Sequence, residues 1–201
     1  MAKLFFRYGT MNSGKSTALM QVAYNYEERG MRVIVLKPSI DTKADSSVES
    51  RLGVNRKTDL LVPPELDLLL TVQADIQKNG PLSCALIDEA QFLKSHQIDE
   101  LLHITVDLNV PVICYGLRTD FSTAGFEGSN RLMQLAHSIE EMKTICACGR
   151  KALLNGRKVN GAFVFEGEQV AIDTVDNVEY EALCASCYFE KRESYFKSLN
   201  K

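Results

Sequence analysis

The sequence predicts an α/β fold, with a parallel sheet covered by helices on both faces, followed by a small cysteine-rich unit. Short apolar runs alternate with helical patterns from Lys3 to about Lys143. Strands that are apolar on both faces and separated by helices are typical of parallel sheets buried between helical layers. The composition changes near Thr144, and two close pairs of cysteines follow. We therefore expect two units, residues 1–143 and residues 144–201.

The first strand and the first helix flank a phosphate-binding loop. Leu4 to Phe6 predict a buried strand, and Thr17 to Arg29 predict a helix that stops at Gly30. Between them, Gly9 to Ser16 complete the pattern G-x-x-x-x-G-K-[ST]. The strand–loop–helix context distinguishes this motif from a glycine-rich turn that matches by chance.

Each fixed position of the loop has a mechanical reason. Gly9 and Gly14 allow backbone conformations that a side chain would block, and the loop amides and the helix N-terminus face an anion. Lys15 reaches the β- and γ-phosphates, and the Ser16 hydroxyl is positioned to ligate Mg²⁺. The motif predicts a nucleoside triphosphate site on a P-loop NTPase fold of the RecA-like kind. Its predicted binding residues are Gly9, Thr10, Met11, Asn12, Ser13, Gly14, Lys15 and Ser16.

The later elements follow the same alternation. We expect strands at 32–36, 84–87 and 110–115 and helices at 66–77 and 96–108. The stretch from Ser39 to Thr58 is too rich in Asp, Ser and Lys for the core, so it predicts a mobile loop over the site. In the second unit, Ala162 to Ile172 alternates and is broken at Glu166-Gly167, which predicts a two-stranded hairpin. A helix within Glu181 to Leu199 is expected to close the chain.

Two acids follow the apolar strand Ala85 to Ile87. An acid at the end of such a strand anchors Mg²⁺ opposite the hydroxyl of the phosphate loop, and Asp88 fits that role. Glu89, one residue on, is expected to point elsewhere and to serve as a base. Such a base would activate water in an ATPase or a substrate hydroxyl in a kinase, and its position alone does not choose between them.

The six cysteines divide into two groups. Cys84 and Cys114 lie inside apolar strand-like runs and are expected to be small core residues. The other four form a Cys-x-Cys pair and a Cys-x-x-Cys pair, which is the ligand number of a closed structural zinc site. A unit this small buries little apolar area, and metal binding of order 10 kcal/mol would stabilise it. The predicted zinc ligands are Cys146, Cys148, Cys184 and Cys187.

The chain has 201 residues, 45% of them hydrophobic, which is enough for one sizeable core and a small added unit. No apolar run approaches the roughly 18 residues that span a bilayer, and no secretory pattern precedes the first strand. The net charge of −3 provides no basic field for nucleic acid. We expect a cytoplasmic protein that binds neither membranes nor nucleic acids.

Taken together, these residues resemble the type II thymidine kinases, the zinc-containing class, and most closely the bacterial branch. The resemblance covers nearly the whole chain. It rests on Met11 in the phosphate loop, on Asp88 to Phe92, on Tyr115 to Phe121, on the four cysteines and on Tyr180. It implies transfer of the ATP γ-phosphate to the 5′-hydroxyl of thymidine, with Mg²⁺ and a structural Zn²⁺. It also implies a homotetramer and feedback inhibition by thymidine triphosphate.

The resemblance also assigns roles by position. Glu89 looks like the general base, while Asp88 looks like the residue serving Mg²⁺ and Gln91 like a further nucleotide-binding residue. The thymine pocket it implies has Met11 beneath the base and walls formed by Phe92, Leu117, Phe121 and Phe126. The lasso loop it implies covers the nucleoside with Gln169, Val170, Ala171, Ile172, Asp173 and Tyr180. Asp41 looks like part of a flexible loop near the phosphates.

Two positions depart from the family pattern. Ile172 is followed by Asp173-Thr174, where family members commonly carry two glycines, and Cys187 stands where the bacterial pattern often has His. The first change bears on the lasso contacts, whereas the second leaves four ligands for zinc.

A second hypothesis comes from a different class: a P-loop ATPase whose zinc ribbon binds nucleic acid or another protein. Only a few basic residues lie near the cysteines, namely Arg150, Lys151, Arg157 and Lys158. Few aromatic stacking positions accompany them. DNA-stimulated ATP hydrolysis would favour this second hypothesis over the first.

Overall fold

The computed structural model describes residues 1–39, 47–49, 53, 55–169 and 177–199. Its large sheet has six strands in the order β5-β2-β6-β7-β1-β8, and every neighbouring pair is parallel. The predicted parallel α/β architecture is confirmed. The strands are β1 (Leu4–Tyr8), β2 (Val33–Pro38), β5 (Leu60–Val62), β6 (Cys84–Ile87), β7 (Val112–Gly116) and β8 (Ser138–Glu141).

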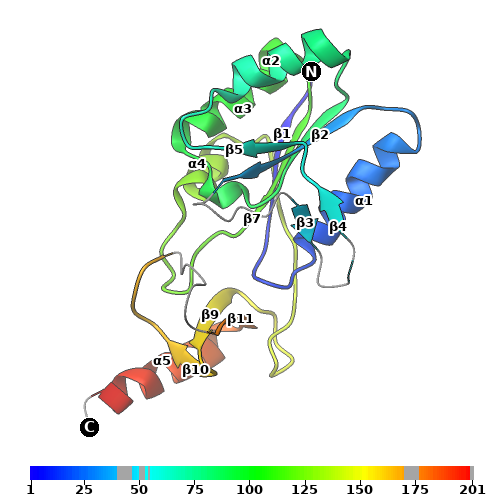
Figure 1. The fold of residues 1–201 in the computed structure, drawn as a ribbon. Coiled ribbons are helices and arrows are strands. Elements are labelled where there is room, and N and C mark those ends of the chain that lie inside the picture. Colours follow the sequence, from blue (N-terminus) through cyan, green and yellow to red (C-terminus); the bar gives the residue numbers. More distant parts are fainter. Residues whose placement is uncertain (40–46, 50–52, 54, 170–176, 200–201) are drawn as a thin grey trace.

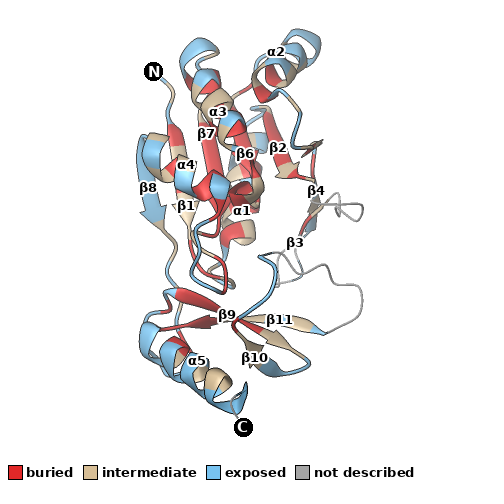
Figure 2. Cartoon of the chain, turned by 90° about the vertical axis from the view of Figure 1, so that its left-hand side faces the viewer, coloured by how far each residue is buried: buried red, intermediate tan, exposed pale blue. Residues whose placement is uncertain are grey.

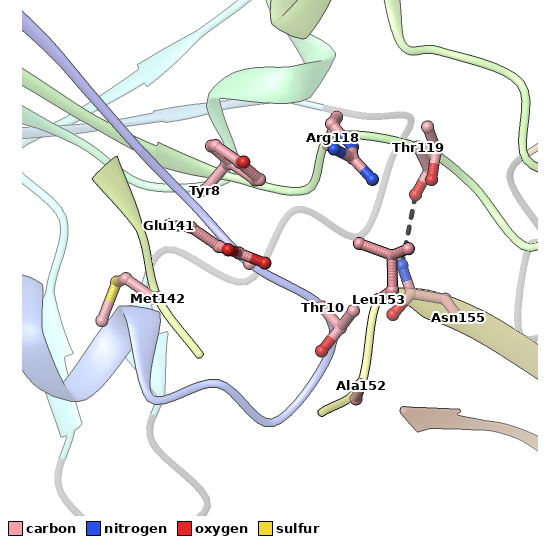
Figure 3. Close-up of a pocket in the computed structure, with 10 residues that line it drawn as sticks. Tyr8, Thr10, Arg118, Thr119, Glu141, Met142, Ala152, Leu153 and Asn155 are labelled. Atoms are coloured by element: carbon pink, nitrogen blue, oxygen red, sulfur yellow. Dashed lines mark hydrogen bonds between the residues drawn. The ribbon is translucent and has the colours of Figure 1, made fainter. Parts of the chain in front are cut away.

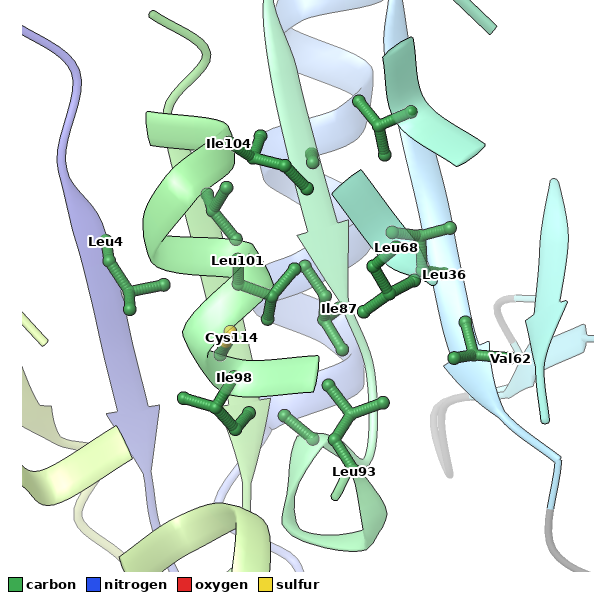
Figure 4. Packing of buried hydrophobic residues seen from close by; sticks show 14 of the residues in the cluster. Leu4, Leu36, Val62, Leu68, Ile87, Leu93, Ile98, Leu101, Ile104 and Cys114 are labelled. Atoms are coloured by element: carbon green, nitrogen blue, oxygen red, sulfur yellow. The ribbon is translucent and has the colours of Figure 1, made fainter. Parts of the chain in front are cut away.

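Helices cover both faces of this sheet (Figure 1). On one face, α1 (Lys15–Glu27) packs Leu19 against a buried cluster that includes Leu86. On the other face lie α2 (Leu68–Asn79), α3 (Ser95–Asp107) and α4 (Glu127–Leu135), and Ile87 packs with Ile98 there (Figure 4). Leu86 and Ile87 are adjacent and belong to different clusters, because successive strand side chains point to opposite faces. This is the covering on both sides that the apolar strands predicted.

The predicted helices are present, with ends shifted by a few residues. The first helix starts at Lys15 rather than Thr17, directly after the left-handed Gly14. Helix α2 starts at Leu68 rather than Leu66, because the Asp67 carboxylate caps it by accepting from the Leu70 amide at 2.8 Å.

The region between Ser39 and Thr58 contains more structure than expected. Strands β3 (Ser47–Glu49) and β4 (Asn55–Lys57) pair antiparallel, and Val48 is fully buried against the α1 cluster. The expectation that no core residue lies here was wrong, since a single apolar residue between polar neighbours gives no periodic signal. Asp41 lies outside the described residues.

The second unit has its own sheet and core. Strands β9 (Leu154–Val159), β10 (Ala162–Val164) and β11 (Val178–Leu183) are antiparallel in the order β10-β9-β11, and α5 (Ala185–Leu199) packs against them. The carboxyl ends of the large-sheet strands point toward this unit (Figures 1 and 2). Figure 2 shows buried residues concentrated in the large sheet and along β9. We call residues 144–199 the cysteine module.

The hairpin prediction in the cysteine module was wrong in position. Among the described residues the turn lies at Asn160-Gly161, where both residues have positive φ (51° and 82°), and residues 165–169 form no strand. Val170 to Ile172, the end of the predicted hairpin, lie outside the described residues. Two consecutive left-handed residues suit the tight turn of a hairpin, and Asn-Gly is the usual pair there. Helix α5 begins at Ala185 rather than Glu181, because Glu181 is still paired in β11.

Besides β3, β4, β9 and β11, several short elements were not predicted. They are β5, β8, α4 and a 3₁₀ turn, η1 (Ala90–Phe92). Each is brief or polar; β8 reads Ser-Ile-Glu-Glu and lies at the sheet edge. Within the described residues, no helix has both the length and the hydropathy needed to cross a membrane.

Candidate active site

The predicted phosphate loop joins the end of β1 to the start of α1. Gly14 has a φ of 79°, and a Cβ on Gly9 would lie 2.3 Å from the Ser13 hydroxyl oxygen and 2.5 Å from the Met142 carbonyl oxygen. Both positions therefore require glycine. The loop ends at the N-terminus of α1, whose unpaired amides form a site for an anion.

Lys15 is the buried cation of this loop. It is 8% exposed, and its Nζ donates to the Thr10 carbonyl at 2.8 Å. Burial lowers the pKa of Lys15, while the charges of Glu89 and Asp88 act in the opposite direction. A phosphate would give this ammonium a fully charged partner in place of a carbonyl, so the loop favours an anionic ligand.

Asp88 and Glu89, directly after β6, have separate surroundings. Asp88 is 3% exposed, and burial together with the Glu89 charge raises its pKa to about 7, against the opposing charges of Lys37 and Lys15. Glu89 has a left-handed backbone with a φ of 50°. It lines the cavity described below, whereas Asp88 is not among the lining residues. The two neighbouring carboxylates thus serve different spaces.

The surroundings of Asp88 suit a divalent cation. A buried carboxylate whose pKa is raised lacks sufficient positive charge nearby, and a bound cation would favour its ionised form. The Ser16 hydroxyl, in the first turn of α1, is the other oxygen that the loop motif assigns to Mg²⁺. Oxygen ligands of these two kinds fit Mg²⁺.

Gln91 links the acid pair to the next strand. It is 1% exposed; its Nε2 donates to Glu89 Oε2, and its Oε1 accepts from the Leu117 amide at 3.0 Å. The close approach depends on Gly116, where a Cβ would lie 2.7 Å from Gln91 Oε1. Gln91 was predicted for the nucleotide side, and it lines the cavity beside Glu89.

A cavity of about 190 Å³ lies beside the phosphate loop. Phe92 and Phe126 meet edge to face in its lining, with ring centroids 5.4 Å apart. Aromatic walls with a few convergent polar groups are the usual make-up of a small-molecule site. The lining residues are Met11, Glu89, Gln91, Phe92, Leu117, Asp120, Phe121, Phe126, Asn155, Gln169 and Tyr180.

Most residues expected for the nucleoside meet in this cavity. They are Met11, Phe92, Leu117, Phe121, Phe126, Gln169 and Tyr180. The other four, Val170, Ala171, Ile172 and Asp173, lie outside the described residues.

Two lining residues were missed by the sequence reasoning. Asp120 accepts from Gln169 Nε2 at 3.0 Å, and Asn155 Oδ1 accepts from the Met11 amide at 2.8 Å. Asn155 Nδ2 also donates to the Thr119 carbonyl at 3.2 Å. Asp120 lies within Tyr115 to Phe121, a segment on which the family resemblance rests, and that resemblance could have identified it. Asn155 begins an Asn-Gly pair that ordinarily marks a turn, yet it lies inside β9.

Asn155 also borders a second, smaller recess, next to the phosphate loop (Figure 3). Arg118 covers the Tyr8 ring there, with its guanidinium carbon 5.5 Å from the ring centroid, and Thr10 and Glu141 complete the polar lining. Figure 3 shows the Asn155–Thr119 hydrogen bond at the edge of this recess. Asn155 therefore lines both this recess and the larger cavity.

The four predicted zinc ligands form one cluster. Their sulfurs all lie within 4.8 Å of one another, and Cys148 Sγ is 3.6 Å from Cys184 Sγ. Four thiolates around zinc at about 2.3 Å would be roughly 3.8 Å apart, which this spacing accommodates. The cluster joins the chain after β8 to the start of α5, and it fits a closed structural zinc site.

Comparisons with known proteins agree on one family. A family model described as thymidine kinase matches residues 2–188. A protein of Rhodopirellula baltica named thymidine kinase is 45% identical over 186 residues, covering 92% of this chain and 86% of its own. A thymidine kinase of Lactobacillus johnsonii is 43% identical over 196 residues, covering 94% and 97%. One of Xanthomonas campestris is 47% identical over 174 residues, covering 86% and 83%.

Proposed function

This chain belongs to the thymidine kinase family, and we infer that it transfers the γ-phosphate of ATP to the 5′-hydroxyl of thymidine, giving dTMP for pyrimidine deoxynucleoside salvage. The observation that carries this function is a single cavity lined by Glu89, by aromatic walls and by Met11 of the phosphate loop. A carboxylate, an aromatic-walled cavity and a residue of the phosphate loop therefore meet at one point.

Glu89 is the proposed general base. Its carboxylate accepts the proton of the 5′-hydroxyl as that oxygen bonds to the γ-phosphorus. The bond from this phosphorus to the oxygen it shares with the β-phosphate breaks, and ADP leaves. Two contacts support the assignment: Glu89 lines the cavity, and Gln91 donates a hydrogen bond to its carboxylate. Lys15 and the loop amides would stabilise the charge on the transferred phosphate.

Ser16 and Asp88 are proposed to hold Mg²⁺, which when bound would neutralise charge on the β- and γ-phosphates. The burial and raised pKa of Asp88 support this role. Asp88 would then act on the nucleotide through Mg²⁺, and Glu89 on the 5′-hydroxyl of thymidine.

The apolar walls of the cavity are proposed to hold the thymine ring. A pocket that receives the C5 methyl gains about 1–3 kcal/mol from it. Deoxyuridine is therefore expected to be a weaker substrate and not an excluded one. The polar groups of Asp120 and Asn155 are available to orient the nucleoside. From the family resemblance, the lasso over the nucleoside is proposed to comprise Gln169 to Asp173 and Tyr180, of which Val170 to Asp173 lie outside the described residues.

The cysteine module is proposed to carry a structural Zn²⁺ on Cys146, Cys148, Cys184 and Cys187. The sulfur cluster supports this, and four thiolates would leave no open position for a reacting water. From family membership we further propose a cytoplasmic homotetramer that is inhibited by thymidine triphosphate. The two units are proposed to divide at residues 143 and 144.

A nucleoside panel tests the function. With ATP and Mg²⁺, thymidine should give dTMP, deoxyuridine should react more weakly, and 5′-deoxythymidine should bind without reaction because it lacks the accepting hydroxyl. ADP release with no nucleoside monophosphate, or hydrolysis stimulated by DNA, would instead support the ATPase hypothesis.

A further inference from the structure

Arg157 is a buried cation in the middle of β9, outside the catalytic groups named above. It is 5% exposed, and its guanidinium carbon lies 3.5 Å from the centroid of the Phe121 ring. Its Nη1 donates to the Glu168 carbonyl at 2.7 Å and its Nη2 to the Glu166 carbonyl at 2.8 Å. Its Nε has no hydrogen-bond partner among the described residues. Arginine is seldom buried unless its charge is well partnered, so these contacts must offset the cost of burying the Arg157 guanidinium.

The segment that Arg157 binds is shaped to receive it. Gly167, between the two accepting carbonyls, has a φ of 113°, and a Cβ there would lie 2.7 Å from Arg157 Nη2. The backbone conformation therefore favours glycine, and a Cβ there would displace the tip of the Arg157 side chain. Two carbonyls in fixed positions match the planar fork of a guanidinium, whereas the single ammonium of lysine would not reach both in the same way.

The Phe121 ring and the Glu166–Glu168 segment, which Arg157 contacts, both connect to the cavity. Phe121 lines the cavity, and its carbonyl accepts from the Tyr188 hydroxyl at 2.7 Å, which fixes the backbone behind the ring. Gln169 follows Glu168 directly; it lines the cavity and donates to Asp120. Arg157 therefore ties an aromatic wall of the cavity to the segment that brings in Gln169.

We propose that Arg157 is a positioning residue for the nucleoside: its guanidinium holds the Phe121 ring and the Glu166–Glu168 segment in the arrangement that forms the thymidine site. This rests on the proposed function. The contacts recorded for Arg157 go to the nucleoside side of the cavity, and none of them reaches the phosphate loop among the described residues. Its effect is thus expected on thymidine and not on ATP.

The test is a split between two Michaelis constants. Arg157→Met keeps the length of the side chain and removes both charge-assisted hydrogen bonds and the stacked cation. We expect the thymidine KM to rise at least about tenfold, which corresponds to about 1.4 kcal/mol, with the ATP KM within about twofold and kcat within about threefold. Arg157→Lys should recover part of the loss. Gly167→Ala, which disturbs the same contact from the other side, should raise the thymidine KM in the same direction.

Arg32→Met is the matched control. Arg32 also donates to two backbone carbonyls, those of Gly80 and Pro81, and pairs with Asp75 at 2.6 Å. It precedes β2 at the opposite end of the sheet from the cavity. Thermal melts of all variants report their folding. Should Arg157→Met not fold, the Arg157→Lys and Gly167→Ala variants carry the test.

Each outcome has a defined meaning. A raised thymidine KM with an unchanged ATP KM in the Arg157 and Gly167 variants, and no such split in Arg32→Met, supports the proposal. Equal changes in both KM values, no change, or the same split in Arg32→Met would overturn it. Failure of the wild-type protein to make dTMP would instead refute the proposed function, so the two failures are distinguishable.

Discussion

The proposed phosphate half of the site comes from two short stretches of chain, whereas the proposed nucleoside half is assembled from residues far apart in the sequence. Gly9 to Ser16 and Asp88 each follow one strand of the large sheet. The nucleoside half depends on contacts such as Met11 to Asn155 and Phe121 to Tyr188, which join that sheet to the cysteine module. The first half is determined by local backbone geometry, and the second by the docking of two units.

This difference suggests which perturbations separate the two halves. A change in the cysteine module should first weaken thymidine binding. A change at the end of β6 should alter turnover, metal binding or the pH dependence of stability. Asn155 is the exception, because it belongs to the module and accepts from an amide of the phosphate loop.

Metal removal should have the largest effect. Binding of order 10 kcal/mol exceeds what the small core of the module would supply alone, so strong chelation should unfold β9, β11 and α5. Thymidine binding should then be lost, while the parallel sheet still binds ATP, with its affinity lowered by about the three- to tenfold expected below for the loss of the Asn155 contact. Zinc analysis, thermal melts and separate titrations of the two substrates measure this. Cys84→Ala removes a cysteine outside the cluster and serves as the control; its melt should respond to chelator as that of the wild type does. A wild-type melt that chelator leaves unchanged would contradict the prediction.

Glu89→Gln should lower turnover with little change in binding. Loss of a general base typically lowers kcat by about 10²–10⁴-fold, and the amide keeps the size of the side chain. Steady-state kinetics and ATP titration distinguish this from a binding defect. Turnover near that of the wild type would remove Glu89 from the base role.

Asp88→Asn should change how stability depends on pH. The folded pKa of about 7 lies above the unfolded value, so the folded state binds more protons between about pH 4 and 7. Stability from this group is therefore greatest below pH 4 and is lost as the pH rises through about 7. Without nucleotide or Mg²⁺, the variant should be more stable than the wild type at pH 8 by about 2–4 kcal/mol, and this advantage should shrink toward pH 4. Urea unfolding across this range measures it, and a pH-independent difference would refute it.

Asn155→Leu should have the smallest effect of the four. It removes the acceptor of the Met11 amide, a contact worth about 1 kcal/mol, so the ATP KM should rise about three- to tenfold. Asn177→Leu places the same substitution at an exposed position beside β11 and should leave the ATP KM unchanged. Equal effects in both variants would show that Asn155 does not couple the two halves.

How much of the protein follows from its sequence depends on how local each feature is. The phosphate loop, the acid pair and the apolar strands can be predicted from the sequence, because neighbouring residues specify their geometry. Asn155 and Arg157 are not, since Asn-Gly favours a turn and an arginine is usually exposed. Their roles depend on Met11, Phe121 and the 166–168 backbone, which only the folded chain brings together. The hairpin turn was predicted at Glu166-Gly167 because these residues break the alternation. In the structure this break lies where the Glu166 carbonyl accepts from Arg157.

We infer that Glu89 and the phosphate loop together transfer one phosphate group to a thymidine hydroxyl. Supplying ATP labelled at the γ-phosphate and following the label tests this most directly. The wild type should place one label on dTMP for each ADP released, and Glu89→Gln should bind ATP yet yield little labelled dTMP. Label recovered as inorganic phosphate in the presence of saturating thymidine, or equal label transfer by Glu89→Gln, would contradict the account.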